Sequence, residues 1–370
     1  MTVPITSLPI RLKDILLATM EDEAEKLKDA LSKYTGCEHV FLTDSGISAL
    51  HLLFKAYGVD RGSRVGLPAY VCEKLVRFVI DYGCRPRLFD VDHSYNISPD
   101  RMEKVDVLIA VHMFGNPCEI DELRDFSKVI IEDSAQCIGA KYKDRSVGSL
   151  GDSSFFSFGM GKPITAMGGG AIATNDDRIA RMLRNSNSKG GRSKVFKALS
   201  YWLVTKRWMY RMMKGRMDRL RKERRNKLKE RCSFEPRGIC KYQASLGARM
   251  IERLEDFNRK RIKNYEEIRK GLMKSKGVML PKVSKDASPI FLRLPVYMEN
   301  DHFRSAVERF LLSGGIETTK PYEYVPEFFG MNGEYPIARK LVMGTITLPT
   351  HPSLTSKDIN TIIEVFRRLG

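Results

Sequence analysis

A lysine beside glycines is the first residue whose setting suggests chemistry. Lys162 follows the apolar run 155–158 and precedes a glycine-rich turn, 168–170, which leads into a second apolar run. Glycines let another group approach closely, and burial lowers the pKa of a lysine because its ammonium form loses hydration. The free amine is a nucleophile that can form a Schiff base with an aldehyde. The alternative interpretation is a solvated loop lysine.

A carboxylate at a strand end is the second candidate. Asp133 follows the apolar run 129–131, where a carboxylate is poorly solvated and needs a cationic or hydrogen-bonding partner. The nitrogen of a pyridoxal ring would serve, because a nearby carboxylate keeps that nitrogen protonated and the ring an electron sink. The alternative is that Asp133 caps a helix.

The segment 44–50 resembles a phosphate-binding turn. It joins a short strand, 39–43, to an apolar helix and contains Ser45 and Gly46. A helix N-terminus presents free N–H groups and the positive end of the helix dipole, which suit a phosphate. Ordinary helix capping by Ser45 or Ser48 is the alternative.

The elements that must position these residues alternate between strand and helix. Strands are expected at 64–68, 87–90, 105–112 and 128–133, and helices at 72–82 and 120–127. This alternation predicts an α/β fold with a mainly parallel sheet, whose carboxyl-end edge collects ligands. Four residues whose side chains could take part in chemistry or binding fall at that edge: Ser45, His112, Asp133 and Lys162.

Longer helices are expected at both ends of this unit. Apolar spacing predicts a helix over 11–34, with Gly36 as its C-cap, and a linking helix over 244–274. Alternating strands and helices after residue 288 predict a compact α+β domain. The predicted divisions are a large domain at 1–188, an insertion at 189–232, a return to the large domain at 233–275, and a small domain at 276–370.

Composition bounds the class of protein. The chain has 370 residues, is 42% hydrophobic, and has no apolar run long enough to span a membrane. Its N-terminus lacks the features of a signal peptide. Seven scattered cysteines form no C-x-x-C pair, and the histidines form no H-E-x-x-H motif, so we expect no metal site and a cytoplasmic location.

The net charge of +18 is concentrated in the insertion. Residues 189–232 contain 17 Lys/Arg, 3 Asp/Glu and both tryptophans. Aromatic and basic residues together suit a helix at a membrane surface, which predicts a peripheral contact through 193–231. The alternative is a helical excursion packed against a partner subunit. Nucleic acid is disfavoured because no nucleic-acid-binding motif accompanies the charge.

Several short motifs occur together in a family-specific order. They are Ser45-Gly46, Val111-His112-Met113-Phe114-Gly115, Glu132-Asp133-Ser134-Ala135-Gln136, Val147-Gly148-Ser149-Leu150-Gly151-Asp152, Phe156-Ser157-Phe158 with Lys162, Gly314-Gly315-Ile316-Glu317-Thr318, and the segment 348–355. In order and spacing they resemble the DegT-type sugar aminotransferases, across about residues 20–188 and 236–370.

The resemblance implies a fold-type-I enzyme dependent on pyridoxal 5′-phosphate (PLP). Such an enzyme would move an amino group from an amino acid, L-glutamate by resemblance, to a nucleotide-linked keto-sugar for surface glycan or related amino-sugar synthesis. A homodimer is expected on the same ground. A PLP-binding protein of this fold with a regulatory or other non-transaminase role, or a membrane-surface binding protein on an inactive fold, are the alternatives.

The resemblance also assigns residue roles. Lys162 would bond covalently to the cofactor, and Asp133 would partner its ring nitrogen, so these two are the catalytic candidates. The remaining cofactor-binding candidates are Ser45, Gly46, Ile47, Cys72, Gln136 and Ser157. The substrate-binding candidates are His112, Arg237, Tyr322 and His351.

Two of these positions depart from the family pattern. Ile47 stands where the family usually has threonine, and Cys72 stands where an aromatic residue usually stacks on the ring; Tyr70 or the Cys72 thiol would substitute for that aromatic residue. The family's asparagine, supplied by the partner subunit, is also missing before Arg237.

Overall fold

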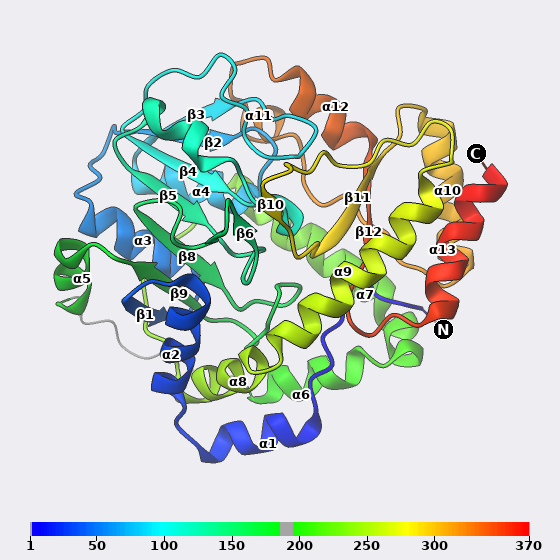
Figure 1. Cartoon of the computed structure of the whole chain (residues 1–370), viewed down its shortest axis with the longest axis horizontal. Helices are drawn as coiled ribbons and strands as arrows, with labels where there is room; N and C mark the ends of the chain where they lie inside the picture. Colours follow the sequence, from blue (N-terminus) through cyan, green and yellow to red (C-terminus); the bar gives the residue numbers. More distant parts are fainter. Residues whose placement is uncertain (1, 186–194, 370) are drawn as a thin grey trace.

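A seven-stranded sheet forms the centre of the large domain in the computed structural model, which describes residues 2–185 and 195–369 (Figure 1). Its order is β1-β9-β8-β5-β4-β2-β3. The strands are β1 (His39–Thr43), β2 (Arg64–Pro68), β3 (Arg85–Phe89), β4 (Val107–Val111), β5 (Ile130–Asp133), β8 (Ser153–Ser157) and β9 (Gly170–Thr174). From β8 to β3 all neighbours pair in parallel, while β9 is antiparallel to both β8 and β1. The prediction of a mainly parallel sheet is confirmed.

Helices cover both faces of this sheet. One apolar core lies under α3 and α4, and a second lies under α2 and α8. The helices and 3₁₀ turns of the large domain are α1 (Leu12–Met20), α2 (Ala24–Thr35), α3 (Gly46–Ala56), α4 (Glu73–Tyr82), η1 (Met113–Gly115), η2 (Ile120–Phe126), α5 (Asp177–Arg184) and α8 (Lys241–Ile251). A small sheet at the domain's side contains β6 (Lys141–Tyr142), β7 (Arg145–Ser146) and β10 (Ala287–Ser288).

The small domain packs helices against one antiparallel strand pair. Its elements are α9 (Leu254–Leu272), β11 (Arg293–Tyr297), α10 (Asp301–Ser313), β12 (Thr345–Pro349) and α13 (Ser356–Leu369). Between α10 and β12 the chain forms α11 (Val325–Phe329) and α12 (Pro336–Gly344), whose buried residues join the large-domain core under α3 and α4. The helices α9, α10 and α13 enclose a separate apolar core with β11 and β12, and α9 runs from the large domain into the small one (Figure 1). The predicted α+β character of this region is confirmed.

Two predicted helices are each divided in the structure, and at the first break a tertiary contact supplies hydrogen bonds. The helix expected over 11–34 becomes α1 and α2, where the Ser245 hydroxyl donates to the Glu21 carbonyl and accepts from the Glu23 N–H. The helix expected over 244–274 becomes α8 and α9. Gly36 is the C-cap as predicted, with a left-handed φ of 75°.

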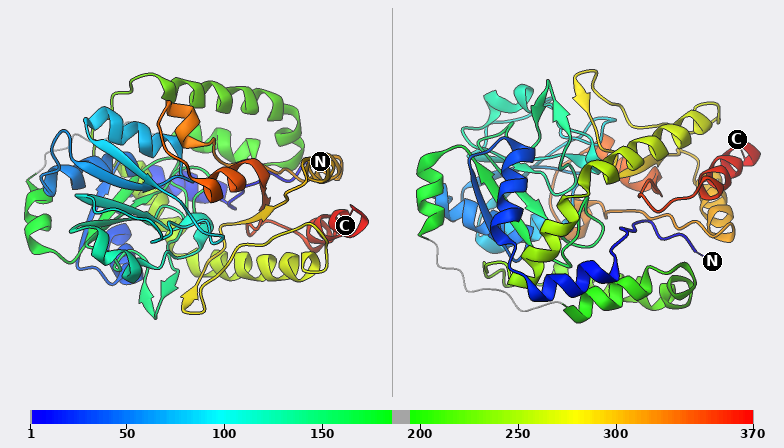
Figure 2. Two further views of the ribbon diagram at one scale, coloured as in Figure 1. Left: turned by 90° about the horizontal axis from the view of Figure 1, so that it is seen from above. Right: turned by 60° about the horizontal axis from the view of Figure 1, so that its bottom comes forward.

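The basic insertion forms two helices, α6 (Val195–Val204) and α7 (Arg207–Asn226), followed by η3 (Lys227–Lys229). Both lie on the surface beside the N-terminal segment (Figure 2). The part of the predicted insertion at 189–194 lies outside the described residues. Three arginines hold α7 to its own chain through carboxylates: Arg207 to Asp358, Arg221 to Glu317, and Arg225 to Glu73 and Glu323. The helix therefore packs within the subunit.

The N-terminal segment joins the small domain through backbone and side-chain hydrogen bonds. The Val3 N–H donates to Gly315, and the Ile5 N–H donates to the buried Glu317 carboxylate. His351 Nε2 lies 2.9 Å from the Pro4 carbonyl, while its Nδ1 accepts from the Ser353 N–H. Burial lowers the pKa of His351 to about 4. This histidine is therefore neutral in the folded protein at pH 7.

Because the pKa of His351 is lowered in the folded protein, we expect the free energy of unfolding to fall in mild acid. The unfolded chain takes up a proton near its ordinary pKa of about 6.5, whereas the folded chain does not until about pH 4. The unfolded state therefore binds more protons in this window, and acid favours it by about 2 kcal/mol between pH 7 and pH 5. Urea unfolding of the parent and of His351→Gln at both pH values measures this difference. A variant with the same loss of stability as the parent would contradict it.

Candidate functional site

The sheet brings Lys162 and Asp133 together as the sequence predicts. Asp133 ends β5, and Lys162 follows β8, the next parallel strand. Burial lowers the pKa of Lys162, and the Asp133 carboxylate opposes this effect. Burial also raises the pKa of Asp133, against the opposing charge of Lys162. The two groups therefore form an amine and a carboxylate held close together in a site with little water.

The close approach of α3 to β8 leaves a place suited to an anion, which we call the anion cradle. A Cβ added to Gly46 would lie 3.2 Å from both the Phe156 carbonyl oxygen and the Ser157 Cβ. Only glycine leaves this space open, so the first N–H groups of α3 begin beside the Ser157 side chain. Helix N–H groups and a hydroxyl are the donors that a phosphate needs. With Lys162 and Asp133, this set of donors fits PLP.

Ser45 and Ile47 flank the cradle in different ways. Ser45 Oγ accepts from the Ser48 N–H, so the capping alternative describes its side chain in this structure. Ile47 offers only its backbone N–H to the cradle, since its side chain packs against the core under α3. Both keep their cofactor-binding roles as predictions.

Residues far apart in the sequence meet around the site. Gln136 Nε2 donates to the Tyr322 hydroxyl over 3.2 Å, which joins a cofactor candidate to a substrate candidate. Tyr322 also contacts Phe114 and Tyr70 with its ring. Cys72 is exposed at the start of α4, near enough to Lys162 to affect its pKa. Gln136 thus contacts Tyr322, and Cys72 lies close to both Tyr322 and Lys162.

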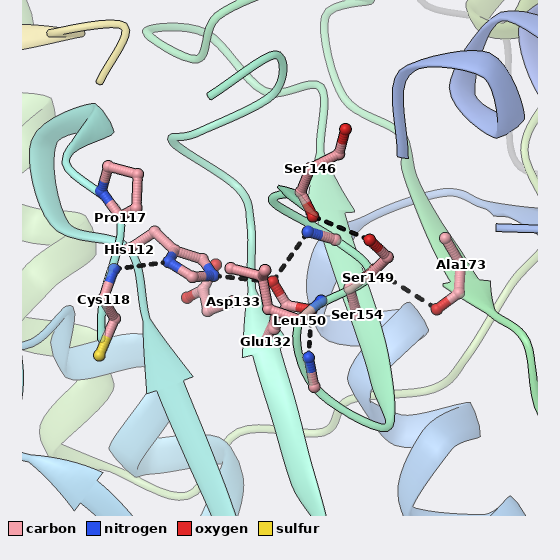
Figure 3. A network of polar contacts seen from close by, with 12 residues as sticks. His112, Pro117, Cys118, Glu132, Asp133, Ser146, Ser149, Leu150, Ser154 and Ala173 are labelled. Carbon is pink, nitrogen blue, oxygen red and sulfur yellow. Dashed lines mark hydrogen bonds and ion pairs between the residues drawn. The ribbon is translucent and has the colours of Figure 1, made fainter. Parts of the chain in front are cut away.

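His112 belongs to a buried network instead of the open part of the site (Figure 3). Its Nδ1 accepts from the Cys118 N–H, so its Nε2 donates to Glu132 over 2.9 Å. The Glu132 carboxylate also accepts from the N–H groups of Gly148, Leu150 and Gly151. Both His112 and Glu132 are 0% exposed, which supports the packed-core interpretation of this histidine.

The other two substrate candidates lie apart from Lys162. The exposed Arg237 side chain pairs with Glu235, while its carbonyl accepts from the Asp44 N–H next to the cradle. His351 binds the N-terminal segment through Pro4 and is buried. Neither side chain is shown facing the site, so their substrate roles stay predictions.

Arg293 is the residue that sequence reasoning missed. It lies on β11, and its Nη2 would be 3.3 Å from a Cβ added to Gly161, the neighbour of Lys162. Its Nε is buried without a hydrogen-bond partner among the described residues. A charge inside the apolar run 290–297 was the available signal. Tyr70 Oη is likewise buried without a partner in the described part of the chain.

A lysine, a carboxylate and a place suited to phosphate at the carboxyl ends of a mainly parallel sheet form the arrangement expected of a PLP-dependent enzyme. The chain belongs to the DegT/DnrJ/EryC1/StrS aminotransferase family, whose model matches residues 12–367. It is thus a PLP-dependent sugar aminotransferase.

Characterised relatives are similar over nearly the whole chain. GDP-perosamine synthase of Escherichia coli O157:H7 is 27% identical over 92% of this chain and 88% of its own length. The dTDP-3-amino-3,6-dideoxy-alpha-D-galactopyranose transaminase of Aneurinibacillus thermoaerophilus is 24% identical over 94% and 90%, respectively.

Solved structures share the fold. The aminotransferase TlmJ from Streptoalloteichus hindustanus gives a TM-score of 0.79 at 21% identity, covering 100% of this chain and 99% of that one. DesV of S. venezuelae gives 0.75 at 23% identity, covering 96% and 93%. The predicted fold class is confirmed.

We expect Glu132→Gln to destabilise the protein by about 3 kcal/mol, because the amide loses the charge that four donors share and places an NH₂ against one of them. Exposed Glu122→Gln is the matched control and should change stability by less than about 0.5 kcal/mol. Urea denaturation measures both. Equal effects of the two substitutions would contradict the role of the network.

Proposed function

We propose that this enzyme transfers the amino group of L-glutamate to a nucleotide-linked keto-sugar. The observation that carries the proposal is the placement of Lys162 and Asp133 beside the cradle of Gly46 and Ser157. The named relatives make or aminate nucleotide-linked sugars, which supports the substrate class. L-glutamate as donor rests on the family resemblance alone.

Each residue of the set has a physical task in this proposal. When bound, PLP supplies an electron sink that stabilises negative charge on the carbon next to the nitrogen. Asp133 would hold the ring nitrogen protonated, and the cradle would hold the phosphate. The Lys162 amine, whose pKa burial lowers, would accept a proton from that carbon and return it.

We expect the purified protein with PLP to absorb in the visible range and to lose that absorbance on addition of L-glutamate. Lys162→Ala should slow the loss by about 10²–10⁴-fold, the range for general acid–base catalysis. Exposed Lys13→Ala is the matched control. Absorbance that L-glutamate, L-glutamine and L-alanine all leave unchanged would contradict the aminotransfer and favour a PLP protein without transaminase activity.

We also propose a homodimer and a peripheral membrane contact. On α1 the side chains of Leu12, Leu16 and Met20 are exposed at a spacing of four, which supports an apolar interface between subunits.

The insertion supports the membrane contact. Phe196, Leu203, Trp208 and Met212 are exposed on α6 and α7 among lysines and arginines. Apolar and basic side chains together suit a surface of anionic lipid. No helix in the described part of the chain is long and apolar enough to cross a membrane.

We expect the intact protein to pellet with vesicles that contain phosphatidylserine and to pellet less with phosphatidylcholine alone, because basic residues gain about 1 kcal/mol each near anionic lipid. Phe196→Ser with Met212→Ser should reduce pelleting. Phe310→Ser with Met343→Ser, exposed on the small domain, is the matched control. Equal pelleting of the two double variants would contradict a contact through the insertion.

A further inference from the structure

A cavity lies between the insertion and the body of the enzyme. It has a volume of about 950 Å³ and lies between α7, the N-terminal residues Ile5 and Thr6, and the segment 317–323. Its inner end reaches Arg293, whose charge acts on Lys162, and the exposed Met160 also lines it. The volume suits a small-molecule ligand. We call it the basic cavity.

One face of α7 forms a wall of the basic cavity. Tyr210, Lys214, Met217, Arg221 and Arg225 recur every three or four residues and therefore lie on one face of the helix. All five line the cavity. The ion pairs of Arg221 and Arg225 with Glu317 and Glu323 hold this face against the small-domain segment.

The charge of the basic cavity is not balanced. Eight lysines and arginines line it, but only three acidic residues do. The three carboxylates, Asp218, Glu317 and Glu323, are each paired with residues of α7. Five lining cations have no ion pair among the described residues: Lys222, Arg224, Lys229, Lys320 and Arg293. The cavity therefore has unused positive charge.

Arg293 extends the positive charge of the cavity toward Lys162. Its guanidinium lies near Lys162, and burial lowers the pKa of Arg293. Leaving a buried charge without a partner costs stability, whereas an anion bound by two parallel hydrogen bonds would satisfy it. Lys222, Arg224 and Lys320 are exposed at the outer rim. Cations thus extend from the reacting lysine outward.

We propose that the basic cavity binds the diphosphate group of the amino-acceptor substrate, so that the insertion helix α7 recognises the substrate within its own subunit. This inference rests on the proposed function. Cations at both the inner end and the rim suit a group with several negative charges better than a single carboxylate. Apolar side chains of Met217, Leu220 and Phe328 are available to the group attached beyond the phosphates.

Calorimetric titration of the full-length protein loaded with PLP tests the inference, since the cofactor then occupies the cradle at Gly46. The probes are inorganic pyrophosphate, uridine diphosphate, farnesyl diphosphate and uridine. The three diphosphates should bind and uridine should not. The double variant Lys222→Ala/Arg224→Ala should weaken diphosphate binding about tenfold. Arg216→Ala/Arg219→Ala removes the same charge from parts of α7 that do not line the cavity and should weaken binding little.

The outcomes separate the two proposals. Tighter binding of uridine diphosphate would identify a nucleotide carrier, and tighter binding of farnesyl diphosphate a lipid carrier; either supports the inference. Equal weakening by the two double variants, or no diphosphate binding, would overturn it. The loss of visible absorbance with L-glutamate is scored separately, so a protein that reacts with glutamate but binds no diphosphate refutes only this inference.

Discussion

The site depends on the hydrogen bonds that the buried carboxylate of Glu132 accepts. A buried carboxyl group with no exposure is stable only when its hydrogen-bonding capacity is filled, and four donors fill it here. Those donors come from the loop after β7 and from His112, which follows β4. Successive strand residues face opposite sides, so the same bonds that fix Glu132 direct its neighbour Asp133 toward Lys162. Of the two adjacent carboxylates, Glu132 thus holds the loop and His112 in place, and Asp133 is left without those bonds (Figure 3).

The sequence predicts the large domain well because its signals are local. Apolar strands alternate with amphipathic helices, Asp133 ends β5, and Lys162 follows the neighbouring parallel strand β8, so the sheet brings both residues to the same edge. Gly46 and Ser157 follow from the same logic, since one begins a helix and the other ends a strand. The resemblance to a known family added the residue roles, which no local pattern supplies.

What the sequence could not predict depends on contacts between distant segments. The break between α1 and α2 follows from Ser245, more than 200 positions away in the chain. Arg293 gains its place near Lys162 only when β11 docks beside the large domain. The position of α7 is likewise invisible to charge counting, because a basic helix against its own small domain and a basic helix in solvent have the same composition.

The insertion therefore has two faces with different physical characters. Arg221 and Arg225 form ion pairs with Glu317 and Glu323, and these pairs hold α7 against the segment 317–323 that lines the basic cavity. Phe196 and Met212 are exposed on the outer surface, where their apolar side chains are in contact with water. Packing against the body of the enzyme does not account for the surplus cations that line the cavity. Contact with lipid does not account for the three arginines of α7 that pair with carboxylates of the same chain. The insertion thus directs its paired and surplus cations to the basic cavity and its exposed apolar side chains to the outer surface.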